Sequence, residues 1–259
     1  MKFAVCVKQV PGTTEVQLDP VTHTIIRDGR KGVTNPFDAA AVELAVTLKE
    51  QVGGSVTAIS MGIPAAESML RDCIARGADE GVLLTDRQFA GADTLATSYT
   101  LSKGIEKMGG ADCILCGRMA VDGDTAQIGP ELAERLGLPH VTDVIAVLSV
   151  EENALVLRKT TADGTIDLRV ALPCVITVLR EVAQVRLPSI EGIRRSFAAP
   201  VHVWSAADIG TDPARTGLNG SPTQVMRTFV PEKTKITKMF SGTPEEQATA
   251  LCTALKEVL

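Results

Sequence analysis

A loop rich in glycine and small polar residues has the composition of a phosphate-binding site. It follows a short apolar run, Cys113–Cys116, which has the length of a buried parallel strand. Gly117, Gly123 and Gly129 come next, and Pro130 suits the first turn of a helix. A strand, a small-residue loop and a helix start present free backbone N–H groups and a positive helix end to a phosphate. The stretch therefore favours a nucleotide site.

Two other interpretations of this loop stay open. Glycines also ease an ordinary tight turn between a strand and a helix. Asp122 and Asp124 count against bare phosphate, because carboxylates repel it, and they suit capping of N–H groups or binding of ribose or ribityl hydroxyls. Thr125 adds a hydroxyl donor. Because the loop matches neither GxxxxGKS nor GxGxxG, its motif alone does not specify the nucleotide.

The cysteines and histidines do not form a catalytic or metal-binding pattern. Cys113 and Cys116 are three residues apart, so on a strand they point to opposite faces, and we predict that both are buried as small apolar side chains. His23, His140 and His202 are scattered without metal-ligand spacing. We expect no metal and no catalytic acid, base or nucleophile, so that any redox chemistry belongs to a bound cofactor.

Composition limits the classes of partner. The chain has 259 residues, a formal net charge of −5 and 3% aromatic residues, which gives no electrostatic or stacking surface for nucleic acid. The first apolar run, Phe3–Val7, is too short for a signal-peptide core, and no run has the length of a membrane span. We expect a cytoplasmic protein without membrane insertion.

The elements that position the loop repeat as strand and helix. The sequence predicts strands at Phe3–Val10, Ser55–Met61, Gly81–Thr85 and Cys113–Cys116, with helices starting near Asn35, Pro64, Asp93 and Pro130. At the first helix, Asn35 suits the N-cap, Pro36 the first turn and Asp38 the helix dipole. This order predicts a parallel sheet with right-handed crossovers, whose ligands bind at the carboxyl ends of the strands.

The pattern changes after Val141. Residues 154–160 and 165–170 alternate around an Asp-Gly turn, which predicts an added β-hairpin, and residues 173–178 predict one more buried strand. From residue 184 onward prolines interrupt the chain and no period is sustained until a predicted helix at Glu245–Val258. The sequence therefore predicts an α/β domain at 1–183 and a C-terminal arm at 184–259.

An arm without a core of its own is expected to lie on a partner, and a partly disordered terminus is the alternative. Apolar anchors favour the partner. These anchors are Leu187, Ile190, Ile193, Phe197, Trp204, Leu218 and Phe229.

Several segments in the same order resemble the β (small) subunit of electron transfer flavoproteins over the whole chain. The matching segments are VCVKQVPGT (5–13), NPFDAAAVELAVTLKE (35–50), CIARGAD (73–79), GRMAVDGDTAQIGP (117–130), RLPSIEGIRR (186–195) and GLNGSPT (217–223). The resemblance implies an adenine nucleotide hydrolase-like α/β nucleotide-binding core. It also implies a heterodimer with a larger, FAD-carrying α subunit, which the C-terminal arm embraces.

Two branches of that family differ in the nucleotide of the β subunit. In one branch it is AMP with a structural role. In the electron-bifurcating branch it is a second FAD, reduced by NADH, which sends one electron to ferredoxin or flavodoxin. The other electron goes through the α-subunit FAD to a dehydrogenase such as an acyl-CoA or lactate dehydrogenase. Residues 122–130, 7–11 and 91–94 resemble the bifurcating branch. A stand-alone nucleotide-binding module without a redox role is a third possibility, but it has no use for the long arm.

The resemblance and the loop together predict the contacts. We expect backbone contacts to adenosine from Cys6 and Met61, hydroxyl contacts from Asn35 and Asp38, and a phosphate cradle from the backbone of 122–129. Thr94 and Thr97 are further candidates, and Lys8 and Arg118 supply either positive charge or structural pairs. The expected cofactor-binding residues are Cys6, Lys8, Asn35, Asp38, Met61, Gly62, Thr94, Thr97, Gly117, Arg118, Asp122, Gly123, Asp124, Thr125, Ala126, Gln127, Ile128 and Gly129. The segment that resembles the family's loop for docking a dehydrogenase is Arg186, Leu187, Pro188, Ser189 and Ile190.

Overall fold

The structure is a computed structural model that describes residues 1–12, 32–226 and 237–256. The chain divides into two compact units, Met1–Val225 and Met226–Leu259.

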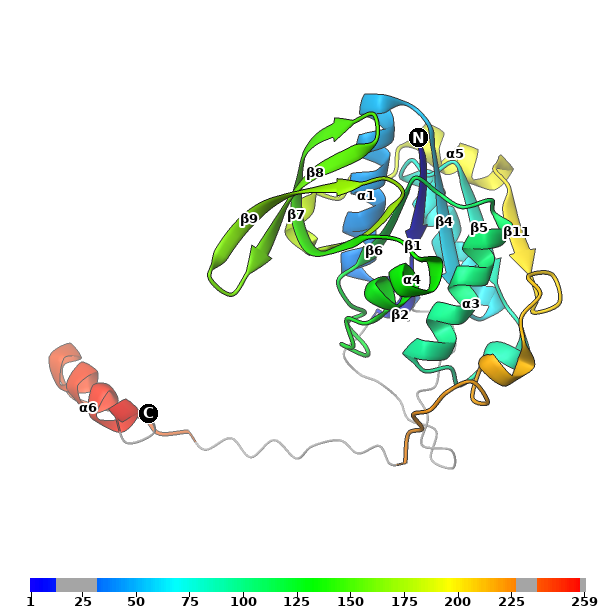
Figure 1. Cartoon of the computed structure of the whole chain (residues 1–259). Helices are drawn as coiled ribbons and strands as arrows, with labels where there is room; N and C mark the ends of the chain where they lie inside the picture. The colour runs from blue at the N-terminus through cyan, green and yellow to red at the C-terminus, as the bar shows by residue number, and fades with distance from the viewer. Residues whose placement is uncertain (13–31, 227–236, 257–259) are drawn as a thin grey trace. The chain divides into compact units, whose positions relative to one another are not determined.

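A nine-stranded sheet forms the centre of the first unit (Figure 1). From one edge to the other its strands are β11 (Val201–Trp204), β5 (Glu80–Leu84), β4 (Ser55–Met61), β1 (Lys2–Cys6), β6 (Cys113–Gly117), β10 (Cys174–Val178), β7 (His140–Glu151), β8 (Ala154–Thr161) and β9 (Gly164–Ala171). The strands from β11 to β7 pair in parallel, and β7, β8 and β9 pair antiparallel. The predicted α/β class, parallel sheet and added hairpin are confirmed.

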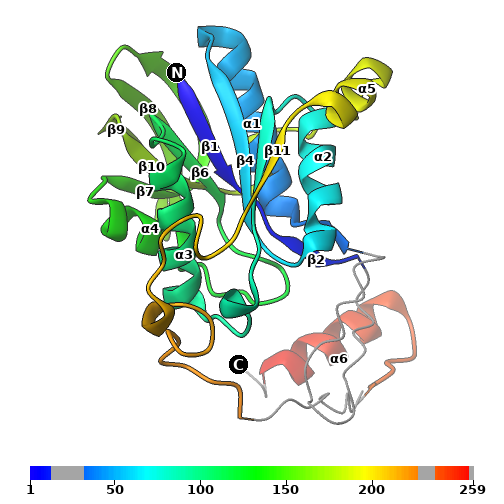
Figure 2. The same ribbon diagram turned by 90° about the vertical axis from the view of Figure 1, so that its right-hand side faces the viewer.

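Helices cover both faces of the parallel part of the sheet (Figure 2). Helices α1 (Pro36–Val52) and α2 (Glu67–Ala75) lie on one face, and α3 (Thr94–Lys107) and α4 (Ile128–Leu136) lie on the other. Because strand side chains alternate, Val5 belongs to the same core cluster as Leu44 of α1, whereas its neighbour Ala4 belongs to the cluster of Leu101 of α3 and Leu132 of α4. Short 3-10 turns complete the unit at Pro64–Ala66, Arg87–Phe89, Arg180–Val182 and Pro213–Arg215.

The same alternation separates the two cysteines of β6. Cys113 belongs to the core on the α1 and α2 face, and Cys116 belongs to the core on the α3 and α4 face. Both are fully or almost fully buried free thiols. A hydrogen bond with Cys6 and burial raise the pKa of the Cys116 thiol well above its ordinary value. The prediction that these cysteines pack as small apolar side chains is confirmed.

The first strand is shorter than the sequence predicts. Instead of running from Phe3 to Val10, β1 ends at Cys6, and β2 (Gln9–Pro11) leaves the sheet to pair with β3 (Gly32–Thr34). The physical reason is that the backbone of Lys8 turns toward α1, where its N–H and C=O groups are bound by residues of the helix start. Most of the polar excursion predicted before residue 34 lies outside the described residues.

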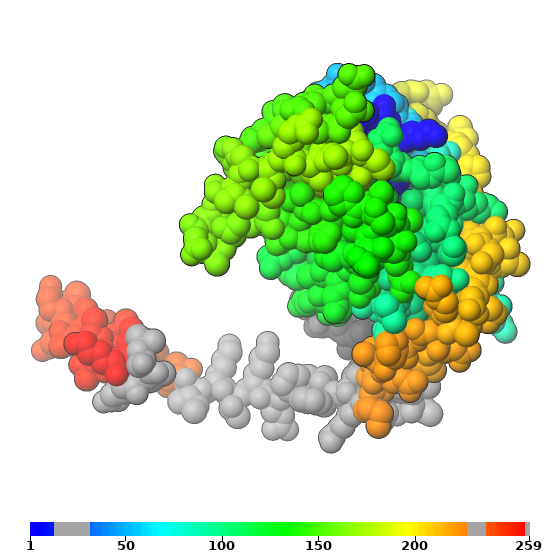
Figure 3. All heavy atoms as spheres, in the orientation of Figure 1, coloured from blue at the N-terminus to red at the C-terminus, as the bar shows by residue number. Residues whose placement is uncertain are grey.

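The first compact unit continues beyond the boundary predicted at residue 183 and ends at Val225. Helix α5 (Ile190–Ala198) contacts α2, and β11 extends the sheet beside β5. The segment needs no hydrophobic period, because it uses backbone bonds to an existing strand edge. Figure 3 shows the following segment, drawn from yellow to orange, against the face of the unit.

The second unit contains helix α6 (Pro244–Lys256), close to the helix predicted at 245–258. None of its described residues is buried. Among the predicted anchors, Phe229 lies outside the described residues.

Candidate functional site

The candidate site lies where the strand order reverses. From β1 the chain proceeds through β4 to β5, and it then returns to place β6 on the other side of β1. Connections therefore leave the carboxyl ends of β1 and β6 toward opposite faces of the sheet, and this opening is where doubly wound folds bind ligands. The residues that follow these two ends are Val7-Lys8 and the loop that starts at Arg118.

A buried carboxylate at the start of α1 joins the two strand ends. Asp38 accepts hydrogen bonds from the backbone N–H of Lys8 at 2.8 Å and from that of Gly117 at 3.1 Å. Burial raises the pKa of Asp38 from 3.8 to about 7, although hydrogen bonds from Asn35, Lys8 and Gly117 oppose the shift. Its oxygens are therefore engaged by the protein backbone, and Asp38 shapes the site by holding both loops.

Asn35 occupies the N-cap position, as predicted, but its side chain makes no capping hydrogen bond. Its amide group instead donates to the C=O of Met119 at 2.8 Å and accepts from the N–H of Val121 at 3.2 Å. Asn35 is fully buried. It therefore fixes the first part of the loop after β6 against the start of α1. Whether Asn35 or Asp38 also contacts a nucleotide hydroxyl stays a prediction.

The loop from 118 to 127 combines unusual backbone angles with N–H groups that have no acceptor among the described residues. Asp124 and Ala126 have φ angles of 50° and 54°, in the left-handed region that non-glycine residues rarely adopt. Within the part of the chain that the structure describes, the backbone N–H groups of Thr125, Ala126 and Gln127 have no hydrogen-bond acceptor. Consecutive N–H groups in such a conformation form a concave anion-binding nest. Whether this loop cradles a phosphate stays a prediction.

The three glycines of the loop have different roles. A methyl group at Gly117 would collide with Phe37 and Asp38, and one at Gly129 would collide with Thr177. These two glycines are therefore required by contacts within the protein. At Gly123, no atom of the described residues lies within 4 Å of the position of an added methyl group. Open space above Gly123 is consistent with the predicted close approach of a ligand.

Both cations at the site are paired with carboxylates. Lys8 Nζ lies 2.6 Å from Asp122 Oδ1, and Arg118 Nε lies 3.2 Å from Asp143 Oδ1. The sequence left open whether these cations supply positive charge to a ligand or form structural ion pairs, and the structure shows both of them in ion pairs. The pairs also offset the carboxylates around the loop, which would otherwise repel a phosphate.

The starts of α3 and α4 meet beside the loop. Asp93 caps α3 by accepting from the N–H of Ala96 at 3.1 Å. The Thr94 hydroxyl lies 3.1 Å from Gln127 Oε1 and 3.0 Å from Glu131 Oε1. The second oxygen of Glu131 is buried and has no partner among the described residues. Sequence reasoning missed Glu131, whose position follows from the packing of α3 on α4.

The remaining predicted residues lie at the same edge of the sheet. Cys6 and Met61 end β1 and β4, Gly62 follows Met61, and Thr97 lies in the first turn of α3. Ile128 opens α4 directly after the loop. The fold therefore gathers all the predicted cofactor-binding residues along one edge, in the order of strands β4, β1 and β6.

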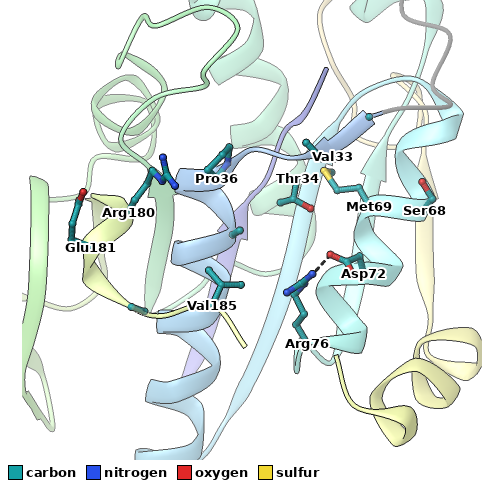
Figure 4. A pocket seen from close by; sticks show the side chains of 13 residues that line it. Val33, Thr34, Pro36, Ser68, Met69, Asp72, Arg76, Arg180, Glu181 and Val185 are labelled. Atoms are coloured by element: carbon teal, nitrogen blue, oxygen red, sulfur yellow. Dashed lines mark hydrogen bonds and ion pairs between the residues drawn. The ribbon is translucent and has the colours of Figure 1, made fainter. Parts of the chain in front are cut away.

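A hollow of the first unit lies away from this edge of the sheet. It has a volume of ≈ 890 Å³ and lies between β3, α1, α2 and residues 180–185 (Figure 4). Its lining includes Asp72, Arg76 and Arg180 and none of the predicted cofactor-binding residues.

Among the described residues, no group of three His, Cys, Asp or Glu side chains could hold a metal ion. No described helix has the length and apolarity that crossing a membrane requires.

The predicted docking residues differ in orientation. Leu187 and Ile190 are 86% and 81% exposed, whereas the guanidinium of Arg186 turns inward to Glu43 and Glu50 of α1. Ser189 caps α5 by accepting from the N–H of Gly192. Pro188 connects the inward and outward residues.

Comparisons with known proteins give a consistent result. The electron transfer flavoprotein domain family matches residues 22–209. The chain is 44% identical over 259 residues to the caffeyl-CoA reductase–Etf complex subunit CarD of Acetobacterium woodii, covering 99% of this chain and 98% of the relative. It is 45% identical over 257 residues to an electron transfer flavoprotein subunit beta of Clostridium acetobutylicum, with coverage of 99% and 98%. Protein FixA of Azorhizobium caulinodans is 43% identical over 238 residues, with coverage of 89% and 85%.

Proposed function

The chain belongs to the electron transfer flavoprotein family as a β subunit, and from this premise we propose that it holds an FAD at the carboxyl edge of its sheet. When bound there, FAD supplies the chemistry of hydride acceptance from NADH and electron delivery to ferredoxin or flavodoxin and, through the α-subunit FAD, to a dehydrogenase. The protein supplies binding and orientation. The observation that carries the proposal is the group of three N–H groups at residues 125–127, which have no acceptor among the described residues and lie beside the strand-order reversal.

Different residues make different contributions to binding the cofactor. The backbone of Thr125, Ala126 and Gln127 binds phosphate, with the start of α4 adding its positive end. Gly123 allows close approach of the pyrophosphate. Asn35 and Asp38 hold the loops in place, so that hydroxyl groups of the cofactor meet a preformed surface.

The choice of FAD over AMP rests on the resemblance of residues 122–130 to the bifurcating branch and on the space around the loop. Residues 123–127 are all exposed, and Thr94 and Glu131 continue the polar surface beyond the nest. A dinucleotide needs such a longer surface, whereas AMP, with its single phosphate, needs only the adenosine contacts and the N–H groups at 125–127. AMP is the alternative function for the same site.

Counting nucleotides separates these alternatives. The αβ complex is purified, denatured with acid, and its released FAD and AMP are counted per heterodimer. Two FAD support the proposal, whereas one FAD plus one AMP shows that the β subunit holds AMP. A folded complex whose β subunit releases no adenine nucleotide would contradict both.

The partners follow from the family and from exposed apolar side chains. β subunits of this family pair with an α subunit, and we propose that residues 226–259 lie on it. Leu187, Ile190 and Phe197, which are 86%, 81% and 75% exposed, form the contact for a flavin dehydrogenase such as an acyl-CoA or lactate dehydrogenase. A stand-alone module is tested by expressing this chain without an α subunit, since a stable monomer with an ordered tail would favour it.

A further inference from the structure

Arg186 is bound by two carboxylates of α1. Its Nε lies 3.0 Å from both oxygens of Glu43, and its Nη1 and Nη2 lie 2.6 Å and 3.0 Å from the two oxygens of Glu50. Its backbone N–H also donates to Glu43 at 2.9 Å. Glu43 and Glu50 are seven residues apart and therefore share one face of the helix. The hydrogen bonds with these carboxylates raise the pKa of Arg186 above its ordinary value.

A second arginine holds the same residue from the other side. Arg76 Nη1 donates to the C=O of Arg186 at 2.6 Å, and Arg76 Nε donates to Asp72 at 2.8 Å. The backbone and the side chain of Arg186 are thus fixed to α1 and α2 together. We call these contacts of Arg186 with Glu43, Glu50 and Arg76 the clamp.

Helix α5 is also fastened directly to α2. Arg195 donates to the C=O of Ile74 at 2.9 Å, and Arg71 donates to the C=O of Ser196 at 2.6 Å. A methyl group at Gly192 would collide with the C=O of Ala75, so the two backbones lie very close. Each end of the segment from 186 to 198 is therefore anchored on the core.

The anchored segment turns an apolar ridge outward. Ile190, Ile193 and Phe197 recur at helical spacing and are 81%, 43% and 75% exposed, and Leu187 precedes them at 86%. Exposed apolar side chains on a rigid support lose little conformational freedom when a partner binds, which strengthens binding without a new contact.

We propose that Arg186 is a positioning residue, which holds this ridge in the geometry that a flavin dehydrogenase binds, and that Arg186 itself does not contact the dehydrogenase. The inference rests on the docking role in the proposed function, which it deepens. It also revises the prediction that Arg186 belongs to the docking contact, because its guanidinium faces α1.

The alternative is that the clamp is an ordinary ion-pair cluster. Such a cluster contributes little to stability, or stabilises the whole fold without positioning the ridge. Amide hydrogen exchange in the αβ heterodimer separates the two. Arg186→Met is expected to accelerate exchange at residues 187–193 by about tenfold or more while leaving β1 and β6 unchanged, since only a local opening is affected. Arg186→Lys should accelerate it less, because one ammonium group cannot bridge both carboxylates.

A matched control is available on the hairpin. Arg158 binds Asp167 through Nε at 2.7 Å and through Nη2 at 2.9 Å, far along the sheet from α5. Arg158→Met should leave exchange at 187–193 unchanged. Unchanged exchange at 187–193 in Arg186→Met, or an equal acceleration in β1 and β6, overturns the proposal.

A docking measurement tests whether the clamp affects the binding of a dehydrogenase. The probe is an acyl-CoA dehydrogenase that the wild-type heterodimer reduces, and the dissociation constant is compared between variants. Leu187→Ala and Arg186→Met should each weaken binding by about tenfold or more, but only Arg186→Met should alter exchange at 187–193. If Leu187→Ala binds normally, the docking role fails, while the exchange result still decides on the clamp. If only Leu187→Ala weakens binding, the positioning role of Arg186 is overturned.

Discussion

Asp38 shows how one buried carboxylate can join two loops of a candidate site. It lies in the first turn of α1, where the helix dipole favours a negative charge. It accepts from N–H groups that follow two different strands, so its loss would release both loops at the strand-order reversal. Because it is buried, its ionisation is unfavourable, and its pKa is raised from 3.8 to about 7.

This raised pKa predicts a pH dependence of stability. The folded protein binds the Asp38 proton more tightly than the unfolded chain does, so the protonated form stabilises the fold at low pH. That stability is lost as the pH rises from about 4 to about 7, and the total is roughly 4 kcal/mol. Asp38→Asn removes the titration. The free energy of unfolding, wild type minus Asp38→Asn, should fall across this pH range in urea titrations. A difference that stays constant with pH would contradict the prediction.

Gly117 and Gly123 predict opposite results for the same substitution. Gly117→Ala should destabilise the fold by about 1–3 kcal/mol, because the methyl group would lie 2.6 Å from the Cβ of Phe37 and closer still to Asp38. Gly123→Ala should leave unfolding unchanged, since no atom of the described part of the chain is within 4 Å of the added methyl group, and should weaken FAD binding to the αβ complex. Urea unfolding and FAD titration measure the two effects. Normal FAD affinity in Gly123→Ala would show that no cofactor approaches this glycine.

At the residue scale, the sequence allows the loop and its edge of the sheet to be predicted, because both follow from local spacing. The role of Asn35 could not be predicted, since its side chain binds Met119 and Val121, more than eighty residues away. Glu131 was missed for the same reason, because its partner Thr94 belongs to another helix. A side chain whose hydrogen-bond partners are distant in sequence leaves no periodic pattern from which those partners could be predicted.

At the element scale, α1 contacts both the candidate site and the segment that carries Arg186. Its first turn carries Asp38 at the candidate site, and the following turns carry Glu43 and Glu50, which hold Arg186. Its N-cap position, first-turn proline and apolar period were enough to predict the helix. Its contacts with residues 186 and 117 depend on tertiary packing and could not be read from the helix itself.

Helix α3 is held at its start by a strap of distant residues, 216–223. Besides capping α3, Asp93 accepts from the N–H of Thr223 at 3.1 Å and from its hydroxyl at 2.8 Å. The N–H of Asp93 donates to Ser221 Oγ at 2.8 Å. The cap of α3 and the attachment of the strap therefore depend on the same carboxylate.

Asp93→Ala is expected to lower the free energy of unfolding by about 1–3 kcal/mol, because it removes both the cap and the bonds to the strap. Thr223→Val is the matched variant, which loses the hydroxyl bond and keeps the cap, and should cost about 1 kcal/mol or less. Urea unfolding gives the energies, and amide exchange at 217–223 should rise in Asp93→Ala. Equal costs for the two variants would show that the cap contributes nothing.

At the scale of the whole molecule, residues 184–225 complete the first unit. The proline-rich composition and the missing hydrophobic period predicted an arm from residue 184. The segment is stable without a period because β11 bonds to β5, for example from the N–H of Thr85 to the C=O of Trp204 at 3.0 Å. A few of its side chains, such as Ala206 and Ile209, are buried in the existing core. A segment that is held by hydrogen bonds to the edge of an existing sheet shows almost no recognisable pattern in its local sequence.

The two candidate boundaries predict different outcomes for truncated chains. A chain that ends at Val225 keeps β11 and the strap, so it should fold, with a cooperative thermal transition. A chain that ends at Ala183 exposes the edge of β5 and the surfaces under Ala206 and Ile209, so it should aggregate or unfold. Circular dichroism melts of both chains measure this difference. Cooperative folding of the shorter chain would restore the boundary at 183.

The chain that ends at Val225 also tests where the α subunit binds. Helix α6 has 13 residues and no buried side chain, and Leu251 and Leu255, one turn apart, are 47% and 49% exposed. A helix of this length is marginal alone in water, and its apolar side chains need a covering surface. When the chain that ends at Val225 is co-expressed with the α subunit, the β subunit should therefore fold but fail to form a stable heterodimer in size-exclusion chromatography. A heterodimer as stable as that of the full chain would show that residues 226–259 do not hold the partner.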